Sequence, residues 1–429
     1  MNLQGELDIK ALGKRIAAFQ KYRNLTQEDL AEKLYVDTST VGRWIRGERT
    51  PTLDNFFRLT KILGASMDEL VSDSPTSITE PVSINFRGKP IVSLARQPRN
   101  EEERMGLRIA KLWFQGYERD VIMKRLNIPE EKAARRYQSR ITGDLLSVNA
   151  EQVPLNAELA QQIQKTFELK TCIVADLGSI GPMLKTVILG ALGAKVITDL
   201  AKQTGVRLSI GFAGGSSCAQ VILSLIKAKS LPNLDVMPIA VQVIQNVVAE
   251  DANTLVGILG LFTQGTDVHT YGLPFVSNAD LEQGTLDEID NTTREILERA
   301  RQVSIAFLGV GANLNYFFHQ KAQHLEKPAM FCGKTLFELQ QMGCIGDILY
   351  NLVSLEGPMP ELQDCLDKMV CSIGLGELQH LSTGHSHVIA VAAGKSKSSV
   401  ARLALKKRYV NGLITDSELA QAVLGLLTY

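Results

Sequence analysis

The sequence lacks the long apolar runs that membrane proteins carry. No stretch of about 18 uncharged apolar residues is present, the length that a membrane-spanning helix requires. The N-terminal stretch MNLQGELDIKALGKR contains acids where a secretory signal peptide has a basic flank followed by an apolar stretch. We therefore expect a cytoplasmic protein that makes no membrane contact.

Cysteine is also scarce, with six residues in a chain of 429, and no two of them form a C-x-x-C pair. So low a content is typical neither of a disulfide framework nor of a structural zinc site. We expect buried or idle thiols at Cys172, Cys218, Cys332, Cys344, Cys365 and Cys371.

An excess of charge of either sign is absent, since 46 Lys and Arg balance 46 Asp and Glu. This balance argues against a surface coated in basic residues, and a hydrophobic content of 45% excludes a disordered or fibrous chain. At roughly 100–200 residues per domain, the length predicts two to four globular units. Locally, Val41–Thr50 holds three arginines against one acid, which suits contact with phosphates.

Residues 1–75 have the pattern of a compact helical domain. Apolar residues recur at helical spacing and are separated by turn or cap residues. The tight turn Tyr35-Val36-Asp37 joins two short helices, and in such a helix-turn-helix the second helix enters the major groove of DNA. The expected helices are Ile9–Tyr22, Gln27–Leu34, Ser39–Arg46, Leu53–Leu63 and Met67–Val71.

The stretch LTQEDLAEKLYVDTSTVGRWIRGERTPTLDNFFRLTKILGASMDEL resembles the Cro-like (XRE) helix-turn-helix family, beginning with its TQ-x-x-LA motif. The resemblance implies a domain that binds a double-stranded DNA operator through Gln27, Ser39, Thr40 and Arg43. It also implies that Trp44 packs beneath the second helix of the pair, and that the core contains Ala31, Val41, Leu53 and Leu63. An α-helical protein-interaction domain is the alternative interpretation.

Two segments follow before the pattern changes. Residues 76–100 are rich in Pro, Ser, Thr and Asn and lack a sustained period, so we expect a linker with one short strand at its centre. Residues 101–150 predict a second, smaller module with helices at Met105–Gly116, Glu118–Leu126 and Pro129–Ile141.

This second module, RIAKLWFQGYERDVIMKRLNIPEEKAARRYQSRI, resembles the DNA-binding domain that precedes the effector domain in the SorC family of bacterial regulators. Glu130 and Glu131 follow its turn, where carboxylates would be repelled by the DNA backbone. Two interpretations stay open. One is a weaker DNA contact through Lys132, Arg135 and Arg136, and the other is a spacer or dimer contact.

Residues 151–429 alternate apolar strands with long helices, which predicts an α/β domain with a parallel sheet. Within it, VRLSIGFAGGSSCAQVI reads in order as a strand, a glycine-rich turn and a helix, an arrangement whose free backbone N–H groups can bind an anion. Gly214 and Gly215 permit close approach, and Ser216 and Ser217 add hydroxyl donors. GVGANL lacks the third glycine of a dinucleotide motif, and AAGKSKS lacks the first glycine of a P-loop.

Four further motifs, VSIAFLGVG, MGCIGDILYNLVSLEG, VIAVAAGKSKSSVARLAL and NGLITDSELAQAVL, follow in that order. Together they resemble the effector-binding domain of the SorC family over roughly residues 155–429. The resemblance implies a Rossmann-like fold related to sugar-phosphate isomerases and deaminases. It also implies a sugar, polyol or sugar-phosphate effector and assembly into a homodimer or homotetramer.

The same resemblance implies roles for individual residues. The turn 214–217 would surround a phosphate, Lys397 would neutralise it, and Asp347 would hydrogen-bond sugar hydroxyls. Gly309 and Gly311 would let the backbone approach the ligand. The alternatives are a helix cap for Asp347 and a solvated first-turn residue for Lys397.

The sequence also departs from the family pattern. Val241-Gln242 stands where many members have two glycines, and Ala240 and Asp251 stand where some have ligands for a second phosphate. We therefore expect a monophosphate or an unphosphorylated sugar rather than a bisphosphate. Asn253 falls in a helix-start motif of the family, and Asp416 is expected to cap the last helix.

His380, His385 and His387 form an H-x4-H-x-H cluster, the one pattern with metal-ligand character. Since no cysteine or carboxylate joins them in sequence, we expect ordinary loop histidines and neither a metal nor a cofactor.

Three functions compete. The leading hypothesis is a bacterial transcriptional regulator, not an enzyme, whose effector modulates operator binding. A second is a sugar-phosphate isomerase or deaminase fused to a DNA-binding domain, although no acid/base pair is evident. A third is a constitutive DNA binder with a degenerate pocket.

Overall fold

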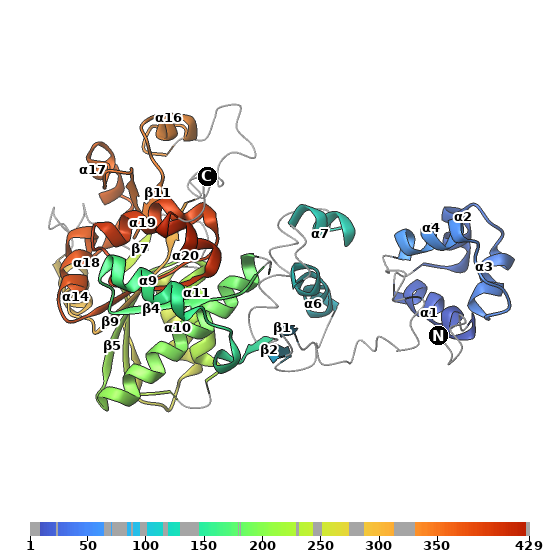
Figure 1. Ribbon diagram of the computed structural model, residues 1–429, viewed down its shortest axis with the longest axis horizontal. Helices are drawn as coiled ribbons and strands as arrows, with labels where there is room; N and C mark the ends of the chain where they lie inside the picture. The colour runs from blue at the N-terminus through green and yellow to red at the C-terminus, as the bar shows by residue number, and fades with distance from the viewer. Residues whose placement is uncertain are drawn as a thin grey trace. The chain divides into compact units, whose positions relative to one another are not determined.

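The computed structural model describes residues 9–22, 25–63, 70, 84–86, 89–94, 101–114, 119–128, 146–178, 180, 182–228, 231–242, 251–273, 287–312 and 331–425. The chain divides into two compact units. One contains residues 1–82 and 119–135, and the other contains residues 83–118 and 136–429. Figure 1 shows the N-terminal helices in blue and the α/β part in green to red.

Residues 9–63 fold into short helices, which are α1 (Ile9–Tyr22), α2 (Gln27–Leu34), α3 (Thr38–Ile45) and α4 (Leu53–Leu63). The predicted bounds of α1, α2 and α4 are confirmed, and α3 begins and ends one residue earlier than predicted. Of the expected helix at Met67–Val71, only Leu70 lies within the described residues.

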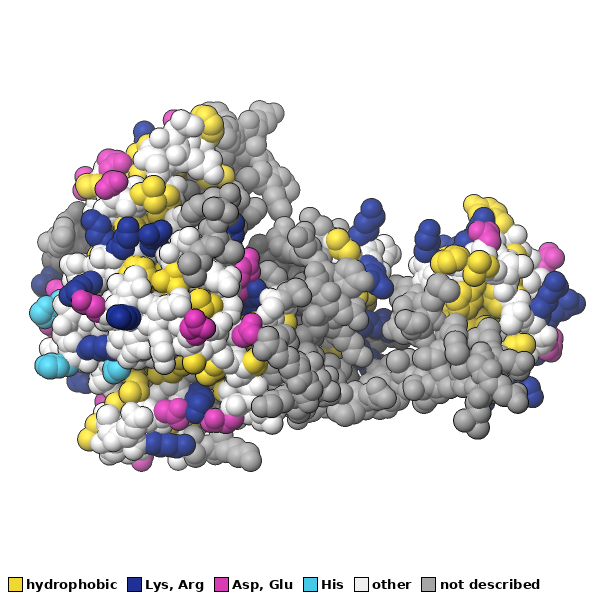
Figure 2. All heavy atoms as spheres, viewed as in Figure 1, with side chains coloured by type: hydrophobic (Ala, Val, Ile, Leu, Met, Phe, Trp, Pro, Cys, Tyr) yellow, Lys and Arg dark blue, Asp and Glu magenta, His cyan; other side chains and the backbone are white. Residues whose placement is uncertain are grey.

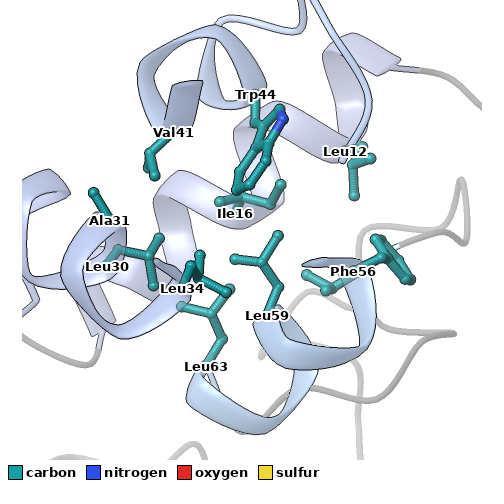
Figure 3. Close-up of a cluster of buried hydrophobic side chains, with 11 residues drawn as sticks. Leu12, Ile16, Leu30, Ala31, Leu34, Val41, Trp44, Phe56, Leu59 and Leu63 are labelled. Atoms are coloured by element: carbon teal, nitrogen blue, oxygen red, sulfur yellow. The ribbon is translucent and has the colours of Figure 1, made fainter. Parts of the chain in front are cut away.

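One apolar cluster holds these helices together (Figure 3). Trp44 is 2% exposed and packs beneath α3, as predicted, and Ala31, Val41 and Leu63 are buried. The prediction for Leu53 is wrong, because its side chain is 69% exposed. It is the first residue of α4, and the stripe that enters the core starts one turn later. The cluster consists of Leu12, Ile16, Leu30, Ala31, Leu34, Val41, Trp44, Phe56, Leu59, Leu63 and Leu70.

The segment expected as a linker contains two strands rather than one, β1 (Ile84–Phe86) and β2 (Lys89–Leu94). β2 pairs antiparallel with β1 and with β3 (Leu146–Val148). The next helices are α6 (Glu101–Phe114) and α7 (Arg119–Arg125). The third expected helix of the second module lies outside the described residues, and so do Glu130, Glu131, Lys132, Arg135 and Arg136.

A seven-stranded sheet forms the centre of the α/β part that the structure describes. Its strands are β4 (Thr171–Ala175), β5 (Leu208–Phe212), β6 (Leu234–Pro238), β8 (Val268–Thr270), β9 (Ile305–Leu308), β14 (His387–Val391) and β15 (Gly412–Asp416). The order is β4-β15-β14-β9-β5-β6-β8, and every pairing is parallel. All residues of β9 and β15 are buried, as expected for parallel strands covered on both faces.

Helices flank this sheet (Figure 1). Their bounds are α9 (Ala157–Phe167), α10 (Pro182–Thr204), α11 (Ser216–Ile226), α12 (Ala252–Phe262), α14 (Asp287–Ala300), α18 (Gly374–Thr383), α19 (Ser398–Lys406) and α20 (Ser417–Leu424), with 3-10 turns η1 (Ala150–Gln152) and η4 (Lys395–Lys397). The chain moves toward β8 through α10, α11 and α12, and returns through α14, α18 and α19. Right-handed crossovers therefore place these two sets on opposite faces. The predicted Rossmann-like α/β fold is confirmed.

Two smaller antiparallel sheets lie beside the main one. β10 (Val310–Gly311), β11 (Gly346–Ile348) and β12 (Asn351–Val353) form the first, and β7 (Ala240–Gln242) pairs with β13 (Val370–Ser372) in the second. Residues 331–369, here called the 331–369 segment, also contain α16 (Leu336–Gln341), η3 (Pro360–Leu362) and α17 (Gln363–Asp367). This segment has an apolar cluster of its own, made of Phe331, Leu339, Cys344, Leu352, Met359, Leu362 and Leu366.

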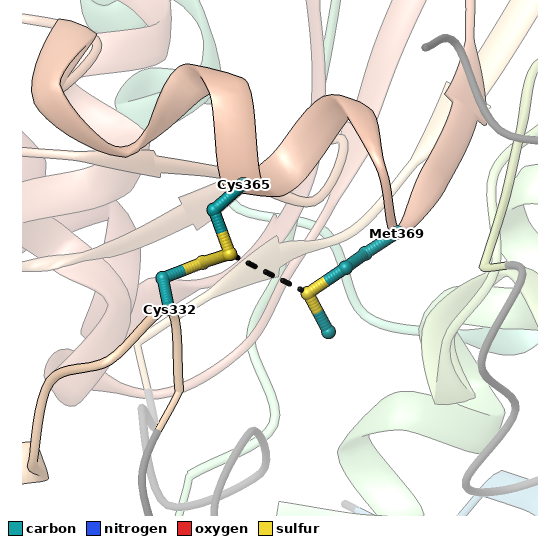
Figure 4. Close-up of a disulfide and its surroundings, with 3 residues drawn as sticks. All are labelled: Cys332, Cys365 and Met369. Atoms are coloured by element: carbon teal, nitrogen blue, oxygen red, sulfur yellow. Dashed lines mark hydrogen bonds between the residues drawn. A yellow bond between two sulfur atoms is a disulfide. The ribbon is translucent and has the colours of Figure 1, made fainter. Parts of the chain in front are cut away.

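The expectation of idle thiols is wrong for two cysteines, because Cys332 and Cys365 form a disulfide (Figure 4). They are 33 residues apart in sequence, with 5.7 Å between their Cα atoms. Sequence spacing did not indicate the pair, since only the fold of the 331–369 segment brings the turn Phe331–Lys334, which holds Cys332, next to α17. The other cysteines are free, with Cys218, Cys344 and Cys371 buried and Cys172 half-buried.

No helix in the described part of the chain is long and apolar enough to cross a membrane.

Candidate functional site

The helix pair α2–α3 is built by local interactions. Thr26 and Asp29 form a capping box at the start of α2, in which the Asp29 amide donates to Thr26 Oγ1 at 3.0 Å and the Thr26 amide donates to Asp29 Oδ2 at 2.7 Å. This hydrogen bonding lowers the pKa of Asp29. Tyr35 ends α2 in the left-handed region with φ 57°, and Asp37 begins α3. The chain thus reverses within a three-residue turn.

The predicted DNA-contacting residues lie on this pair. Ser39, Thr40 and Arg43 share one face of α3, since their spacings are i, i+3 and i, i+4. Ser39 and Arg43 are exposed, and Thr40 is half-buried. Gln27 begins α2, and its Oε1 lies near Gly42, 3.5 Å from where a Cβ would be placed. Figure 2 shows Lys and Arg side chains on the visible face of this unit.

Helix α1 packs closely against the C-terminal end of α3. A Cβ on Gly13 of α1 would overlap the Ile45 carbonyl oxygen and would lie 2.5 Å from that of Trp44. Gly47, at φ 67°, lies against the α1 backbone at Lys10 in the same way. Glycine at both positions therefore lets α1 pack directly against the C-terminal end of α3.

The second site is a cavity of about 550 Å³ at the carboxyl ends of neighbouring strands of the main sheet. β5 and β9 are neighbours in the sheet, but the chain continues from β5 toward β6 and from β9 toward β14, on opposite sides. Open α/β sheets bind ligands at the point where the connections change direction in this way. All eight residues predicted for the effector site line this cavity. The lining residues are Ala213, Gly214, Gly215, Ser216, Ser217, Gly309, Val310, Gly311, Ala312, Asp347, Leu349, Tyr350, Ser396 and Lys397.

The glycine-rich turn after β5 begins α11 at this cavity. Gly215 is the N-cap residue with φ 104° and supplies no side-chain hydrogen bond to the helix. Ser217 is buried, whereas Ser216 is exposed. Gly309 lies beside the turn, since a Cβ on it would be 4.0 Å from Ser217 Oγ. This arrangement presents backbone amides and the positive end of α11 to a bound anion.

Asp347 lies within β11 and not at a helix start, so the alternative of a helix cap is excluded. Burial raises its pKa to about 6, while a hydrogen bond from the Tyr350 backbone and the charge of Lys397 act in the opposite direction. Lys397 is the last residue of η4 and is half-buried, not fully solvated. The cavity thus holds a carboxyl group that titrates near neutrality and a cation within electrostatic range of it.

Six of the lining residues were not among those predicted from the sequence, and they are Ala213, Val310, Ala312, Leu349, Tyr350 and Ser396. Leu349 and Tyr350 form the turn between β11 and β12, with φ values of 53° and 64°. Positive φ at both central residues defines a type I′ turn, which favours Asn and Gly. Asn351 Nδ2 donates to the Leu349 carbonyl at 3.0 Å and steadies the turn. Because neither Leu nor Tyr signals such a turn, no pattern in the sequence could have found it.

Asp416 caps α20, as predicted, by accepting from the Leu419 amide at 3.1 Å. The same Oδ1 accepts from the Gly394 amide at 3.1 Å, in the loop that leads to Lys397. Its Oδ2 accepts from Lys185 Nζ of α10 at 2.6 Å, and both side chains are buried. Asp416 therefore holds a cavity loop as well as a helix.

Two residues named from the family motifs have structural roles. Asn253 bonds both polar groups of the Leu273 backbone, accepting from its N–H at 2.8 Å and donating to its carbonyl at 2.7 Å. Asp251 caps α12 by accepting from the Thr254 amide at 3.1 Å. Neither residue lines the cavity.

The histidine cluster is spread over different environments. His380 and His385 are exposed, while His387 is half-buried with its Nδ1 3.2 Å from Thr171 Oγ1. Burial lowers the pKa of His387. Among the described residues, no group of three His, Cys, Asp or Glu side chains is placed to hold a metal ion.

The fold and the two sites define a protein that combines a helix-turn-helix with a ligand-binding α/β domain. The chain belongs to the family described as "Putative sugar-binding domain", whose profile matches residues 152–425, and residues 21–70 match the family described as "Helix-turn-helix". The resemblances of the N-terminal helix-turn-helix and of the α/β effector domain are confirmed. The chain is thus a sugar-binding transcriptional regulator with an XRE-like domain at its N-terminal end.

Two of the relatives cover most of the chain at low identity, and a third matches a short stretch. The transcriptional regulator LsrR of Klebsiella pneumoniae is 24% identical over 331 residues, which are 76% of this chain and 94% of the relative. The HTH-type transcriptional activator BcrR of Enterococcus faecalis is 38% identical over 50 residues, 12% of this chain and 24% of that protein. The full-length sorbitol operon regulator SorC from Klebsiella pneumoniae is 19% identical, with a TM-score of 0.49, and covers 76% of this chain and 100% of its own.

Proposed function

We propose that this regulator binds an operator through α3 and senses a sugar, a polyol or a sugar monophosphate in the cavity at the carboxyl ends of β5, β9 and β14. The observation that carries the proposal is the convergence of the glycine-rich turn, Asp347 and Lys397 on that one cavity. The three come from segments far apart in the sequence, and each supplies a different part of sugar-phosphate recognition.

In the cavity, a phosphate would accept hydrogen bonds from the amides at Gly215–Ser217 and pair with the Lys397 ammonium. Asp347, when ionised, would accept hydrogen bonds from sugar hydroxyls. Gly311 would let the ligand approach the β10 backbone. A cavity of about 550 Å³ has the size of pockets that hold small metabolites.

On DNA, the exposed face of α3 would enter the major groove, with Ser39, Thr40 and Arg43 at base edges and Gln27 at a phosphate. One helix-turn-helix contacts one half-site, so the active form is proposed to be a homodimer or homotetramer in the cytoplasm. Effector binding would change the population of the DNA-competent arrangement.

Catalysis is the second candidate, because a carboxyl group with a pKa of about 6 suits proton transfer on a sugar phosphate. Steady turnover of a sugar phosphate by the purified chain would favour an isomerase. Saturable binding without turnover would favour the regulator.

The first test is a thermal-shift screen of the full chain against sugars, polyols and their monophosphates. A ligand at 100 times its Kd stabilises by about 2.7 kcal/mol. Lys397→Ala should lower affinity for a phosphorylated hit by about tenfold or more and spare an unphosphorylated one. Lys406→Ala removes an exposed charge from the far end of α19 and is the matched control. Equal affinities in the two variants would remove Lys397 from the site.

The DNA-binding test uses DNA fragments that the wild-type chain has selected from a pool of random sequences. Arg43→Ala should weaken binding by about 1–3 kcal/mol and leave effector affinity unchanged. Arg58→Ala removes one positive charge from α4, where Arg58 pairs with Asp54, and should have little effect. An equal loss of DNA affinity in the two variants would show that only net charge matters. A loss of effector affinity in Arg43→Ala would contradict the proposal that the two sites are separate.

A further inference from the structure

Cys332 and Cys365 are placed differently from the buried cysteines Cys218, Cys344 and Cys371. Both are half-buried and therefore within reach of a small thiol, and Met369 Sδ lies 3.9 Å from Cys365 Sγ (Figure 4). Cys332 occupies the turn Phe331–Lys334 and has φ 49°, in the left-handed region that non-glycine residues avoid. The bond to Cys365 thus links an unfavourable turn position to α17.

The free cysteines are less suited to thiol–disulfide exchange than ordinary thiols. Burial raises the pKa of Cys172, Cys218 and Cys371 to about 12, and burial also raises the pKa of Cys344. Because the thiolate is the reactive form, burial lowers the reactivity of these four side chains. Among the six cysteines, Cys332 and Cys365 are the pair whose sulfur atoms are bonded to each other.

The disulfide adds a covalent link to the small apolar cluster of the 331–369 segment. The cluster of the 331–369 segment is small, and α16 and α17 have six and five residues. Helices this short are unstable without tertiary support. A cross-link that closes a loop restricts the unfolded chain, so its removal weakens the whole segment.

The same segment carries one wall of the cavity. Leu352 belongs to its apolar cluster and lies on β12, where it is paired in register with Asp347 of β11. The turn between these strands, Leu349-Tyr350, lines the cavity. Asp347 is in turn paired with Gly311 of β10. One pair of strands therefore connects the cluster to the residues that line the cavity.

We propose that Cys332 and Cys365 form a reversible thiol–disulfide site that exchanges with small disulfides of the glutathione class, and that its state sets the order of the hairpin Gly346–Val353. In the oxidising direction, the thiolate of one cysteine attacks a glutathione disulfide sulfur and releases one glutathione thiolate. The second cysteine thiolate then attacks the mixed disulfide and releases the other. Two cysteine thiols are oxidised, one glutathione disulfide is reduced, and two protons leave.

The first experiment equilibrates the full folded chain in buffers of graded glutathione to glutathione disulfide ratio. Free thiols are then alkylated and located by mass spectrometry. Cys332 and Cys365 should convert together and reversibly, while the other four cysteines stay reduced. Failure of the pair to oxidise even in glutathione disulfide alone, or to be reduced in excess glutathione, would overturn the site.

The second experiment measures amide hydrogen exchange in both states. Reduction should speed exchange at residues 346–353 by about tenfold or more, the scale expected when a cross-link is lost from a loop. Exchange in β5 and β9 should not change. The double variant Cys332→Ser/Cys365→Ser should exchange fast in either buffer, and Cys172→Ser should behave as the wild type. Equal exchange in the two states of the wild type would contradict the coupling. Neither measurement needs an effector, so this inference and the proposed function fail independently.

Discussion

Gly311 lies directly against the carboxylate of Asp347. The two residues are register partners in β10 and β11, and a Cβ on Gly311 would overlap Asp347 Oδ1 and lie 2.9 Å from Cγ. Gly346 packs as closely against the Gly311 backbone, since a Cβ there would overlap the Gly311 carbonyl oxygen. The position of the Asp347 side chain in the cavity thus depends on glycine at residue 311.

Gly311→Ala should therefore displace Asp347. Overpacking of this kind costs about 1–3 kcal/mol of unfolding free energy, measured by urea denaturation. The effector found by the screen should also bind more weakly. Gly309→Ala is the matched control for stability, because its Cβ would meet Ser217 at an ordinary 4.0 Å. Equal stability of the two variants would show that Asp347 relaxes without cost.

Asp347 should make the stability of the protein depend on pH. Its folded pKa, about 6, is raised from the ordinary 3.8, so the folded state binds a proton more tightly than the unfolded state. Its contribution to stability is complete below about pH 4 and is lost as the pH rises through 6.

Asp347→Asn should remove this dependence. At pH 7.5 the variant should be more stable than the wild type by up to about 3 kcal/mol, and at pH 4 the two should converge. Urea denaturation across this range measures the difference, and the exposed Asp364→Asn should follow the wild type. A variant that is less stable at pH 7.5 would mean that the carboxylate is stabilised in the cavity.

Lys185 and Lys195 offer a comparison within one helix. Both lie on α10 and each pairs with two carboxylates, but Lys185 is 7% exposed and its partner Asp416 is 1% exposed. Lys195 is 33% exposed and pairs with the exposed Glu151 and Asp199.

Lys185→Met should leave Asp416 buried without its cation and cost about 3–5 kcal/mol. Lys195→Met should cost about 1 kcal/mol or less. Thermal and urea unfolding measure both. Because Asp416 also holds the Gly394 amide, the Lys185 variant should weaken effector binding as well. Similar losses in the two variants would show that the Asp416 network is solvated.

Gly13 and Gly257 are both helical glycines, yet alanine should affect them in opposite directions. Alanine in place of an unrestrained helical glycine stabilises by about 1 kcal/mol, and a Cβ on Gly257 would meet nothing within 4 Å. A Cβ on Gly13 would overlap the end of α3, so Gly13→Ala should destabilise the N-terminal unit by about 1–3 kcal/mol. Faster amide exchange in α3, with weaker DNA binding, is the expected readout. Unchanged amide exchange in α3 would mean that α1 moves to accommodate the added methyl group without loosening α3.

Much of the fold could be predicted because its signals are local. The bounds of α1, α2 and α4 follow from apolar spacing and cap residues within a few positions. The strand, turn and helix around Gly214 carry their own pattern, and parallel strands end at the same edge of a sheet. The resemblance to the SorC family assigned the motifs after β5, β9 and β14 to one site, and the shared edge explains why they meet there.

Elements without a local signal were not predicted. The resemblance to the Cro-like family assigned Leu53 to the core, but its place at the start of α4 leaves it outside the packed stripe. The Leu349-Tyr350 turn uses residues that do not favour positive φ, and it exists because β11 and β12 pair around it.

The sequence by itself determined the families of the N-terminal helix-turn-helix and of the α/β domain and the residue types that surround the cavity, since these depend on period, caps and motif order. Only the tertiary structure decided which distant groups meet. Lys185 pairs with Asp416 across 231 positions, Cys332 bonds Cys365, and Gly311 supports Asp347. Such contacts depend on how helices and strands pack, and no residue pattern within a short window of sequence encodes that packing.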